Sequence, residues 1–453
     1  MSEFLENINL PVAYLKSLTL ENVRGFKQQN ILSFSDINQK PAQWTVILGN
    51  NNTGKTTILK CIADLYLKTE KVPSPGFQLT NDNLELTGED FYYINSSNNQ
   101  IDLVSAKTGK YLIDFQMLGE FTPVLVDKKT RSNAVGGSFW GLFKDIRKTI
   151  STICHPHFRQ VFLQGYSTLR KTSESSLSEQ ENVETVQSFF SNNFELINVE
   201  EWLLQINYAS KNGDSPKSER ERAKNIEAKV REIITSDILP DIKGYRFRST
   251  PNFKNYIEFQ TDYGWVRLKD LGYGYQATLA WVMDLAKRMF DHYPNSKNPL
   301  AEPAVVLVDE IDLHLHPEWQ RKIISYLSAI FVNTQFIVTA HSPLIVQSAE
   351  AVNLIMLEKD NDHINVRQQF GNFKGWAVDE ILTELMGMND KTMSDTYLDL
   401  MNQFDEALDN DNYEQAVLAY EGLDKILHPT SPQRKILRIQ MTSLAPANYD
   451  SVG

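Results

Sequence analysis

The segment of residues 49–56, GNNNTGKT, constrains the fold of this chain more than any other feature. It follows a short apolar stretch, residues 44–48, which predicts a buried β-strand, and it precedes residues 57–63, which predict a helix. Together a strand, a glycine loop and a helix form a phosphate cradle, because the N–H groups of the loop and of the helix N-terminus point at the same anion. The segment therefore predicts a nucleoside triphosphate site in an α/β fold.

The side chains of this loop predict how ATP and Mg²⁺ are held. Lys55 is expected to reach the β- and γ-phosphate oxygens, and the Thr56 hydroxyl is expected to be a ligand of Mg²⁺. Gly49 and Gly54 leave room for the phosphates and tolerate backbone angles that are closed to other residues. We expect the contacts to the nucleotide to come from consecutive residues: Asn50, Asn51, Asn52, Thr53, Gly54, Lys55, Thr56 and Thr57.

Composition limits the class of protein to which the chain can belong. With 453 residues, of which 42% are hydrophobic and 23% charged, it is expected to form two or three ordinary globular domains. Its two cysteines give neither a disulfide framework nor metal-ligand spacing. The sequence shows no signal peptide and no run near the roughly 18 apolar residues of a membrane span, so we expect a cytoplasmic protein. A net charge of −12 argues against a uniformly basic nucleic-acid binder, but it leaves room for a local basic groove.

Two further buried strands end in side chains that suit ATP hydrolysis. Residues 304–308, AVVLV, are followed by Asp309 and Glu310. The carboxyl end of a parallel strand would place both carboxylates beside the phosphate loop, where Asp309 would hold the Mg²⁺ shell and Glu310 would polarise the attacking water. The strand at residues 334–339 is followed by His341, whose neutral imidazole is expected to hydrogen-bond the γ-phosphate. Lys55, Glu310 and His341 are thus the predicted catalytic residues.

A second glycine-opened helix is predicted at residues 277–290, directly after the segment LGYGYQ at residues 271–276. Glycines that open a helix form an anion-binding end. The chain already has a phosphate loop for its own nucleotide, so this second end predicts a second subunit. Each chain would then close over the nucleotide of the other, through Gly272 and Gly274.

The remaining elements follow from apolar periodicity. Residues 14–34 predict two strands joined by a tight turn, residues 73–130 predict hairpins, and residues 161–170 predict a buried strand that ends in a glycine turn and an arginine. Further strands are predicted at residues 91–94, 101–104, 111–115, 244–249, 256–260 and 265–268. Helices are predicted at residues 139–157, 186–190, 200–208, 218–235, 277–290, 378–386, 397–408, 413–427 and 432–444.

The chain resembles the ABC-type ATPase heads of the SMC and RecF class, and more narrowly the short AAA-like ATPases of bacterial anti-phage systems of the Septu type. The resemblance covers roughly residues 14–65 and 160–350, and it rests on GNNNTGKT, VVLVDEIDLHLHP and FIVTAHSP. It implies an α/β P-loop NTPase of the ABC-ATPase type, with an antiparallel β subdomain, a helical insert and a C-terminal helical module. It also implies ATP and Mg²⁺ as cofactors, and heads that form a homodimer or a higher oligomer around the nucleotide.

The resemblance assigns further roles residue by residue. His341 would be the switch histidine, Asp312 would lie at the dimer contact, and LGYGYQ would be the signature loop. Relatives commonly have Ser where this chain has Gly272, so slow turnover is expected. Arg24 matches an arginine that approaches the nucleotide. Gln164 is a candidate Q-loop residue and metal ligand, with a plain strand residue as the alternative.

These patterns divide the chain into four expected parts. Residues 1–75 hold the phosphate loop, 76–240 form a β and helical insert that includes the strand near 161–170, 241–375 complete the ATPase core, and 376–453 form a helical docking module. No long heptad run and no metal-dependent nuclease centre is visible. The resemblance to the Septu type implies one hypothesis, an anti-phage ATPase that controls a separately encoded HNH-type nuclease, with nucleic acid as the trigger or as the substrate of the complex. The alternative is a RecF-like repair or recombination ATPase.

Overall fold

The computed structural model describes residues 13–70, 77–86, 100–117, 162–173, 184–388 and 393–445, with short gaps at 22, 81–82, 106–108, 237–238 and 240. The chain forms two compact units, Met1–Trp376 and Ala377–Gly453. The predicted strand at 91–94 and the predicted helix at 139–157 lie outside the described residues.

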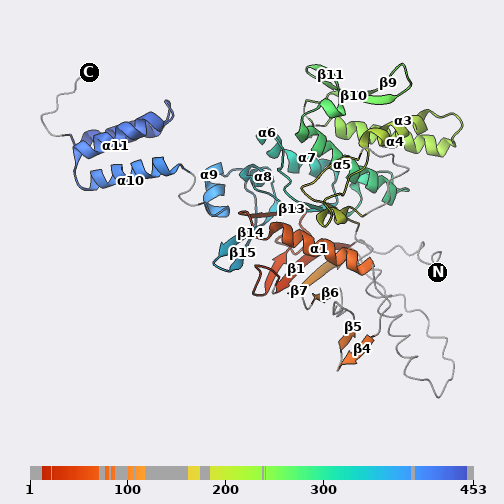
Figure 1. The fold of residues 1–453 in the computed structure, drawn as a ribbon, viewed down its shortest axis with the longest axis horizontal. Helices are drawn as coiled ribbons and strands as arrows, with labels where there is room; N and C mark the ends of the chain where they lie inside the picture. The colour runs from red at the N-terminus through yellow and green to blue at the C-terminus, as the bar shows by residue number, and fades with distance from the viewer. Residues whose placement is uncertain are drawn as a thin grey trace. The chain divides into compact units, whose positions relative to one another are not determined.

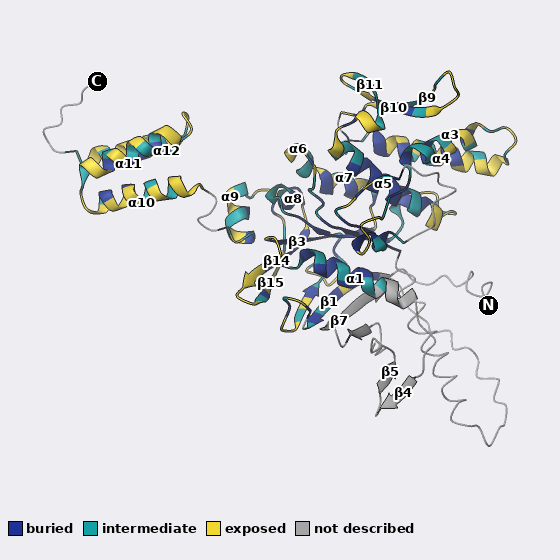
Figure 2. Cartoon of the chain, viewed as in Figure 1, coloured by how far each residue is buried: buried dark blue, intermediate teal, exposed yellow. Residues whose placement is uncertain are grey.

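The first unit is built on a six-stranded sheet in the order β15-β14-β3-β13-β12-β8 (Figure 1). Five of its strands are parallel, and β15 pairs antiparallel with β14 at one edge. In chain order the strands are β3 (Trp44–Gly49), β8 (Leu163–Tyr166), β12 (Ala304–Val308), β13 (Thr334–Thr339), β14 (Val352–Asp360) and β15 (His363–Gly371). Every residue of β3, β8, β12 and β13 is buried, which is why the inner strands are largely apolar in sequence and do not alternate (Figure 2).

The register of this sheet brings the predicted functional segments to one edge. Val308 pairs with both Val338 and Tyr166, and Thr339 pairs with Ile47. The strands β3, β8, β12 and β13 therefore end at nearly the same level. The phosphate loop, Asp309 and His341 all follow from that edge.

A second sheet, antiparallel throughout, packs on the first through a shared core. Its order is β2-β1-β7-β6, with β1 (Ala13–Glu21), β2 (Asn30–Ser33), β6 (Gln100–Ser105) and β7 (Gly109–Met117). One hydrophobic core contains side chains of β1, of the helix α1 (Lys55–Glu70) and of the main sheet, among them Leu18, Ile62 and Ile337. The predicted strands at 14–34, 101–104 and 111–115 are confirmed. A separate hairpin joins β4 (Phe77–Thr80) to β5 (Asn83–Leu86).

The segment between β8 and β12 forms a helical layer and a small sheet. The helices are η1 (Thr185–Phe189), α3 (Val199–Lys211), α4 (Lys217–Ile234) and α5 (Tyr273–His292). The three-stranded sheet, in the order β11-β10-β9, consists of β9 (Gly244–Ser249), β10 (Asn255–Thr261) and β11 (Gly264–Arg267) and lies against α3 and α4 (Figure 1). The sequence predicts that the helix corresponding to α5 starts at residue 277. The structure starts α5 four residues earlier, because the carbonyl of Gly272 accepts hydrogen bonds from the N–H groups of Tyr275 and Gln276.

Short elements complete the first unit: η2 (Leu268–Asp270), η3 (Pro299–Ala301), α6 (Pro317–Gln320), α7 (Ile323–Ile330) and α8 (Pro343–Gln347). The hairpin of β14 and β15 was not predicted from the sequence. β14 is buried for its first six residues, because it extends the main sheet beside β3, whereas most of β15 is only partly buried or exposed at the sheet edge. No helix in the described ranges is long and apolar enough to cross a membrane.

The second unit is helical, with α9 (Val378–Glu380), a π-helical turn η4 (Ile381–Leu385), α10 (Asp395–Asp409), α11 (Tyr413–Ile426) and α12 (Pro432–Ser443). The last three helices agree with the predicted ones, and they share a core of their own that includes Phe404, Leu423 and Leu437. The predicted helix at 378–386 is instead one short α-helical turn followed by the π turn.

Candidate nucleotide-binding site

The phosphate loop lies between β3 and α1, as its sequence predicts. Gly54 has a φ of 92°, and a Cβ at this position would lie 2.9 Å from a ring carbon of Phe26, so both the backbone and the packing require glycine. The carbonyl of Asn50 accepts a 2.8 Å hydrogen bond from the Thr53 hydroxyl. The loop is thus closed on itself at the N-terminus of α1, which favours a bound anion.

Lys55 is buried inside the loop. Its ammonium donates to the carbonyl oxygens of Gly49 at 2.6 Å and Asn50 at 2.9 Å. Burial lowers the pKa of Lys55 below its ordinary value, and the nearby charges of Glu310 and Asp309 limit that fall. The ammonium therefore lies at the junction between the loop and the carboxylates that follow β12.

Asp309 is the centre of an oxygen-rich cluster. Its carboxylate is buried and accepts hydrogen bonds from the hydroxyl of Thr56, at 2.9 Å to Oδ2, and from the hydroxyl of Thr339, at 2.6 Å to Oδ1. Carboxylate and hydroxyl oxygens are ligands that suit Mg²⁺, a hard cation that keeps several waters. Within the described ranges no group of three or more His, Cys, Asp or Glu side chains could hold a metal. Thr56 and Asp309 would accordingly supply a partial shell, completed by water and by phosphate oxygens.

The backbone of Glu310 is held from two sides. Its φ of 49° lies in the left-handed region, which is rare for a residue with a side chain. The N–H group of Glu310 donates to the Thr339 hydroxyl at 2.7 Å, and the Arg170 guanidinium donates to the carbonyls of Asp309 and Glu310, the latter at 2.9 Å. These bonds secure the turn that carries the Glu310 carboxylate.

Arg170 contacts the backbone of this site, although the sequence patterns left it without a role. It is 5% exposed, and its Nε donates to the carbonyl of Ser167 at 3.2 Å. Burial lowers the pKa of Arg170 to about 10, while Asp309 and Asp312 act to raise it, so the guanidinium stays charged at neutral pH. The sequence did contain a signal for such a role, because Arg170 follows the buried strand β8, and the neighbouring strand β12 is followed by Asp309 and Glu310.

His341 lies beside Glu310, as predicted for the two residues at the same sheet edge. Its Nε2 is 3.8 Å from Oε1 of Glu310, and both side chains are about one-third exposed, at 35% and 33%. The N–H group of His341 donates to Oδ2 of Asp312 at 3.0 Å. Asp312 therefore connects the segment after β12 to the segment after β13.

A pocket of about 760 Å³ covers this arrangement. It is lined by the phosphate loop from Asn51 to Thr57, by Glu310 and His341, and by Arg24, whose Nη1 donates to the Thr57 hydroxyl at 3.0 Å. The turn between β14 and β15 also lines it, with Lys359, Asn361, Asp362, His363 and Ile364. Sequence reasoning missed this turn, which is tied to the loop of Arg24 by a 2.9 Å hydrogen bond from the Ile364 N–H to the Gly25 carbonyl.

Gln164 is not brought to the pocket. It lies within β8, where it pairs with Val306, and its side chain is 2% exposed and accepts a 2.8 Å hydrogen bond from the Thr185 hydroxyl. This placement agrees with the alternative interpretation of Gln164, a plain strand residue. Its side chain bonds to Thr185 of η1, and the carboxyl end of β8 lies two residues further along the chain, at Tyr166.

Gly272 and Gly274 lie outside the pocket of their own chain. A Cβ at Gly274 would be 2.4 Å from the carbonyl oxygen of His314, so this glycine allows α5 to pack on the segment that follows Glu310. The ring of Tyr273 meets that of His314 edge to face at 4.6 Å. The start of α5 therefore has partners within the chain as well as a predicted role toward a second one.

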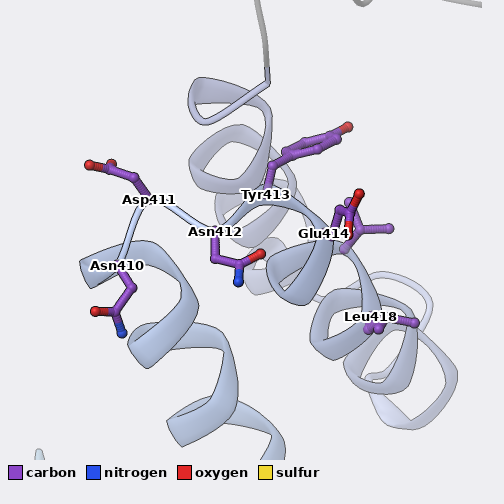
Figure 3. A pocket seen from close by; sticks show the side chains of 7 residues that line it. Asn410, Asp411, Asn412, Tyr413, Glu414 and Leu418 are labelled. Atoms are coloured by element: carbon purple, nitrogen blue, oxygen red, sulfur yellow. The ribbon is translucent and has the colours of Figure 1, made fainter.

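A second pocket lies in the helical unit, at the turn between α10 and α11. It is lined by Asn410, Asp411, Asn412, Tyr413, Glu414, Val417 and Leu418. Figure 3 shows that Asp411 and Glu414 point in different directions and do not converge on a common point. This pocket lacks the paired groups that the first one has.

The chain is similar to known proteins in sequence and in fold. A family model described as "AAA domain, putative AbiEii toxin, Type IV TA system" matches residues 44–347. The Septu protein PtuA of Bacillus thuringiensis is 36% identical over 203 residues, covering 43% of this chain and 51% of that protein. A protein named "Retron Ec83 probable ATPase" from Escherichia coli is 34% identical over 143 residues, covering 32% of this chain and 26% of that protein.

The match to these relatives is therefore partial: the chain spans about half of the first, 51%, and about a quarter of the second, 26%. Among solved structures, an SMC head bound to the C-terminal winged-helix domain of ScpA aligns with a TM-score of 0.42 and 16% identity, over 79% of this chain and 97% of that one.

Proposed function

The chain belongs to the AAA family whose model matches residues 44–347, and from this we propose that it binds and hydrolyses ATP with Mg²⁺ as the metal ion. The observation that carries the proposal is the convergence at one sheet edge of a closed phosphate loop, a buried carboxylate and a carboxylate–imidazole pair. Thr56 lies 2.9 Å from Asp309, and Glu310 lies 3.8 Å from His341.

The residues of the chain divide the work of hydrolysis among them. The N–H groups of the loop and the Lys55 ammonium bind the phosphates. Thr56 and Asp309 would hold the metal ion, which would neutralise charge on the phosphate oxygens. The Glu310 carboxylate orients the attacking water and accepts its proton. His341, next to Glu310, would present its imidazole to the γ-phosphate, and Arg24 also lines the pocket.

The substitution Glu310→Gln tests this division. It keeps the size of the side chain and removes the proton acceptor, so the rate of hydrolysis should fall by about 100-fold or more while ATP affinity is retained. Phosphate release at saturating Mg²⁺ measures the rate, and the fluorescence anisotropy of a labelled ATP analogue measures affinity. Lys55→Ala is the contrasting variant, since loss of the ammonium should weaken ATP binding itself. Turnover at the wild-type rate in Glu310→Gln would refute the role of Glu310.

We further infer that this ATPase serves in anti-phage defence and controls a separately encoded nuclease of the HNH type. Support comes from the Septu and retron proteins to which the chain is similar. The helical unit, Ala377–Gly453, is the candidate docking module, because it contains no residue of the nucleotide pocket. No feature of the site specifically favours the RecF-like alternative.

A further inference from the structure

The small sheet of β9, β10 and β11 has two faces of different chemistry. The inner face carries Tyr245, Ile257 and Phe259, which are buried. The helices α3 and α4 lie against it, and Arg231 of α4 stacks on the Tyr245 ring at 4.3 Å. The outer face carries the alternate residues of the three strands, which we call the arginine–aromatic face: Arg246, Arg248, Tyr256, Glu258, Gln260, Trp265 and Arg267.

The register sets these side chains side by side. Glu258 of the central strand pairs with Arg246 on one side and with Arg267 on the other, and Tyr256 pairs with Arg248. Residues paired across antiparallel strands lie on the same face, with Cβ atoms about 5 Å apart. Glu258 therefore has Arg246 and Arg267 as direct cross-strand neighbours and Arg248 as a diagonal one.

The planar groups on this face are stacked in alternation. The Arg246 guanidinium lies 4.0 Å from the centroid of the Trp265 ring, and the Arg267 guanidinium lies 4.0 Å from the centroid of the Tyr256 ring. Arg246 is also held by Glu258 through a 2.6 Å ion pair, whereas Arg248 lies farther from the same carboxylate, at 3.9 Å. The ion pair and the stacking restrain Arg246 and Arg267, so less entropy is lost when a ligand binds them.

The face carries a net positive charge in a chain that is acidic overall. Three arginines against one glutamate leave two positive charges on it, although the whole chain carries −12. The side chains stay accessible: Arg248 is 55% exposed and the Trp265 residue 37% exposed. Further aromatic rings stand at the two turns of the sheet, Phe253 at 89% exposure and Tyr263 at 99%. An exposed tyrosine and phenylalanine beside a basic sheet face add stacking surface at both ends of it.

We propose that the arginine–aromatic face binds single-stranded nucleic acid. Guanidinium groups recognise phosphates, and aromatic rings and arginine planes stack on unpaired bases, so alternating arginines and aromatics suit a strand whose bases are exposed. A duplex offers its phosphates but hides the faces of its bases, so it would use only half of this surface. The proposal rests on the sheet alone and does not depend on ATP hydrolysis.

The last strand of the arginine–aromatic face is followed closely in the sequence by the expected signature loop, LGYGYQ. β11 ends at Arg267, and only the turn η2 and two residues separate it from α5, whose N-terminus is the expected contact with a partner's nucleotide. A strand bound here would lie near the element through which two chains are proposed to meet. Nucleic acid is therefore a candidate ligand for regulating that contact.

The test uses the full chain and fluorescently labelled 20-nucleotide oligothymidine, 20-nucleotide oligouridine and a 20-base-pair DNA duplex. Fluorescence anisotropy across a range of salt concentrations should show tighter binding of a single strand than of the duplex. Tighter binding of either single strand supports the proposal and identifies the sugar.

Two variants separate charge from stacking. Arg248→Glu with Arg267→Glu should reduce affinity at least tenfold. The slope of the logarithm of the binding constant against the logarithm of salt concentration should become shallower by about 1.4, or 0.7 for each lost phosphate contact. Trp265→Ala should weaken binding about tenfold with an unchanged slope.

The matched control is Lys217→Glu with Lys224→Glu on α4, which makes the same change in net charge on exposed residues away from this face. It should bind the oligonucleotides with nearly wild-type affinity, and thermal unfolding should show that all variants are folded. Equal affinity losses in the control and in the arginine variant would overturn the proposal. Preference for the duplex, or no binding of any oligonucleotide, would also overturn it and would point to an acidic protein partner.

Discussion

At the scale of single residues, Arg170 shows how a buried charge can organise the proposed catalytic carboxylate of Glu310 through the backbone alone. Its guanidinium donates to the carbonyls of Asp309 and Glu310, and Glu310 has a φ of 49°. A non-glycine residue in such a conformation costs about 1–3 kcal/mol and needs surrounding bonds to keep it there. Arg170 supplies two of them, so we regard it as a positioning residue for Glu310.

The substitution Arg170→Lys tests the positioning role. Lysine keeps the charge but lacks the planar fork that spans two carbonyls, so the Glu310 carboxylate should lose its alignment. We expect kcat to fall by roughly 10- to 100-fold, with little change in KM for ATP because Arg170 does not line the pocket. Steady-state phosphate release gives both constants.

A matched control is Arg288→Lys, which alters another largely buried arginine, paired with Asp284 at 2.8 Å and outside the pocket. Both variants should unfold at a lower temperature, but kcat should fall in the Arg170 variant alone. An equal loss of kcat in the two variants would assign Arg170 a purely structural role.

At the scale of elements, the two glycines at the start of α5 differ in the room they leave for a side chain. Gly274 has no room for a side chain, because its Cβ would lie 2.4 Å from the His314 carbonyl oxygen. Gly272, the N-cap, has its nearest neighbour, a ring carbon of Tyr275, at 3.7 Å, which is ordinary contact. A charge at Gly274 would thus disturb the chain itself, and Gly272 is the cleaner position at which to test pairing of two chains around ATP.

In a Glu310→Gln background, Gly272→Asp should leave the chain folded and weaken ATP-dependent pairing at least tenfold, since the carboxylate would face the phosphates of the partner's nucleotide. Sedimentation velocity with and without ATP measures the pairing. Gly274→Ala is the comparison: overpacking should destabilise it by about 1–3 kcal/mol in thermal unfolding without nucleotide. Unimpaired pairing of the Gly272→Asp chain would show that this helix end does not meet the partner's phosphates.

At the scale of the whole molecule, the two units have separate cores. The helical unit buries Phe404, Leu423 and Leu437 among α10, α11 and α12, while Ile436 and Ile439 of α12 remain 56% and 70% exposed. All residues that line the nucleotide pocket belong to the first unit, and the last of them in the sequence is Ile364. ATP chemistry and partner binding are therefore expected to be separable.

Truncation after Trp376 should leave kcat for ATP within about twofold of the full chain and abolish co-purification with the proposed nuclease, since the truncated chain keeps every residue of the pocket. Ile436→Ser with Ile439→Ser in the full chain should likewise lose the nuclease, because two exposed apolar side chains are removed. Affinity purification with the product of the neighbouring gene measures both. Retention of the nuclease by the truncated chain, or DNA cleavage by the full chain alone, would exclude this division.

Local patterns in the sequence determined the parts of the nucleotide site. The glycine loop, the apolar run before Asp309 and the strand before His341 are each defined within about ten residues, because burial on both faces and the turn that follows leave a continuous signature. The order β15-β14-β3-β13-β12-β8 then aligned the strand ends and placed Asp309 beside Thr56.

Tertiary structure alone decided which distant residues support that site. Arg170 lies 139 positions before the Asp309 carbonyl to which it donates, and the β14–β15 turn reaches the loop of Arg24 from the far end of the unit. Gln164 lies in β8, whose end is at the same sheet edge as the phosphate loop, yet its side chain accepts a hydrogen bond from Thr185 and does not line the pocket. Spacing along the chain encodes periodicity and turns, whereas strand order and register decide which side chains meet across the sheet.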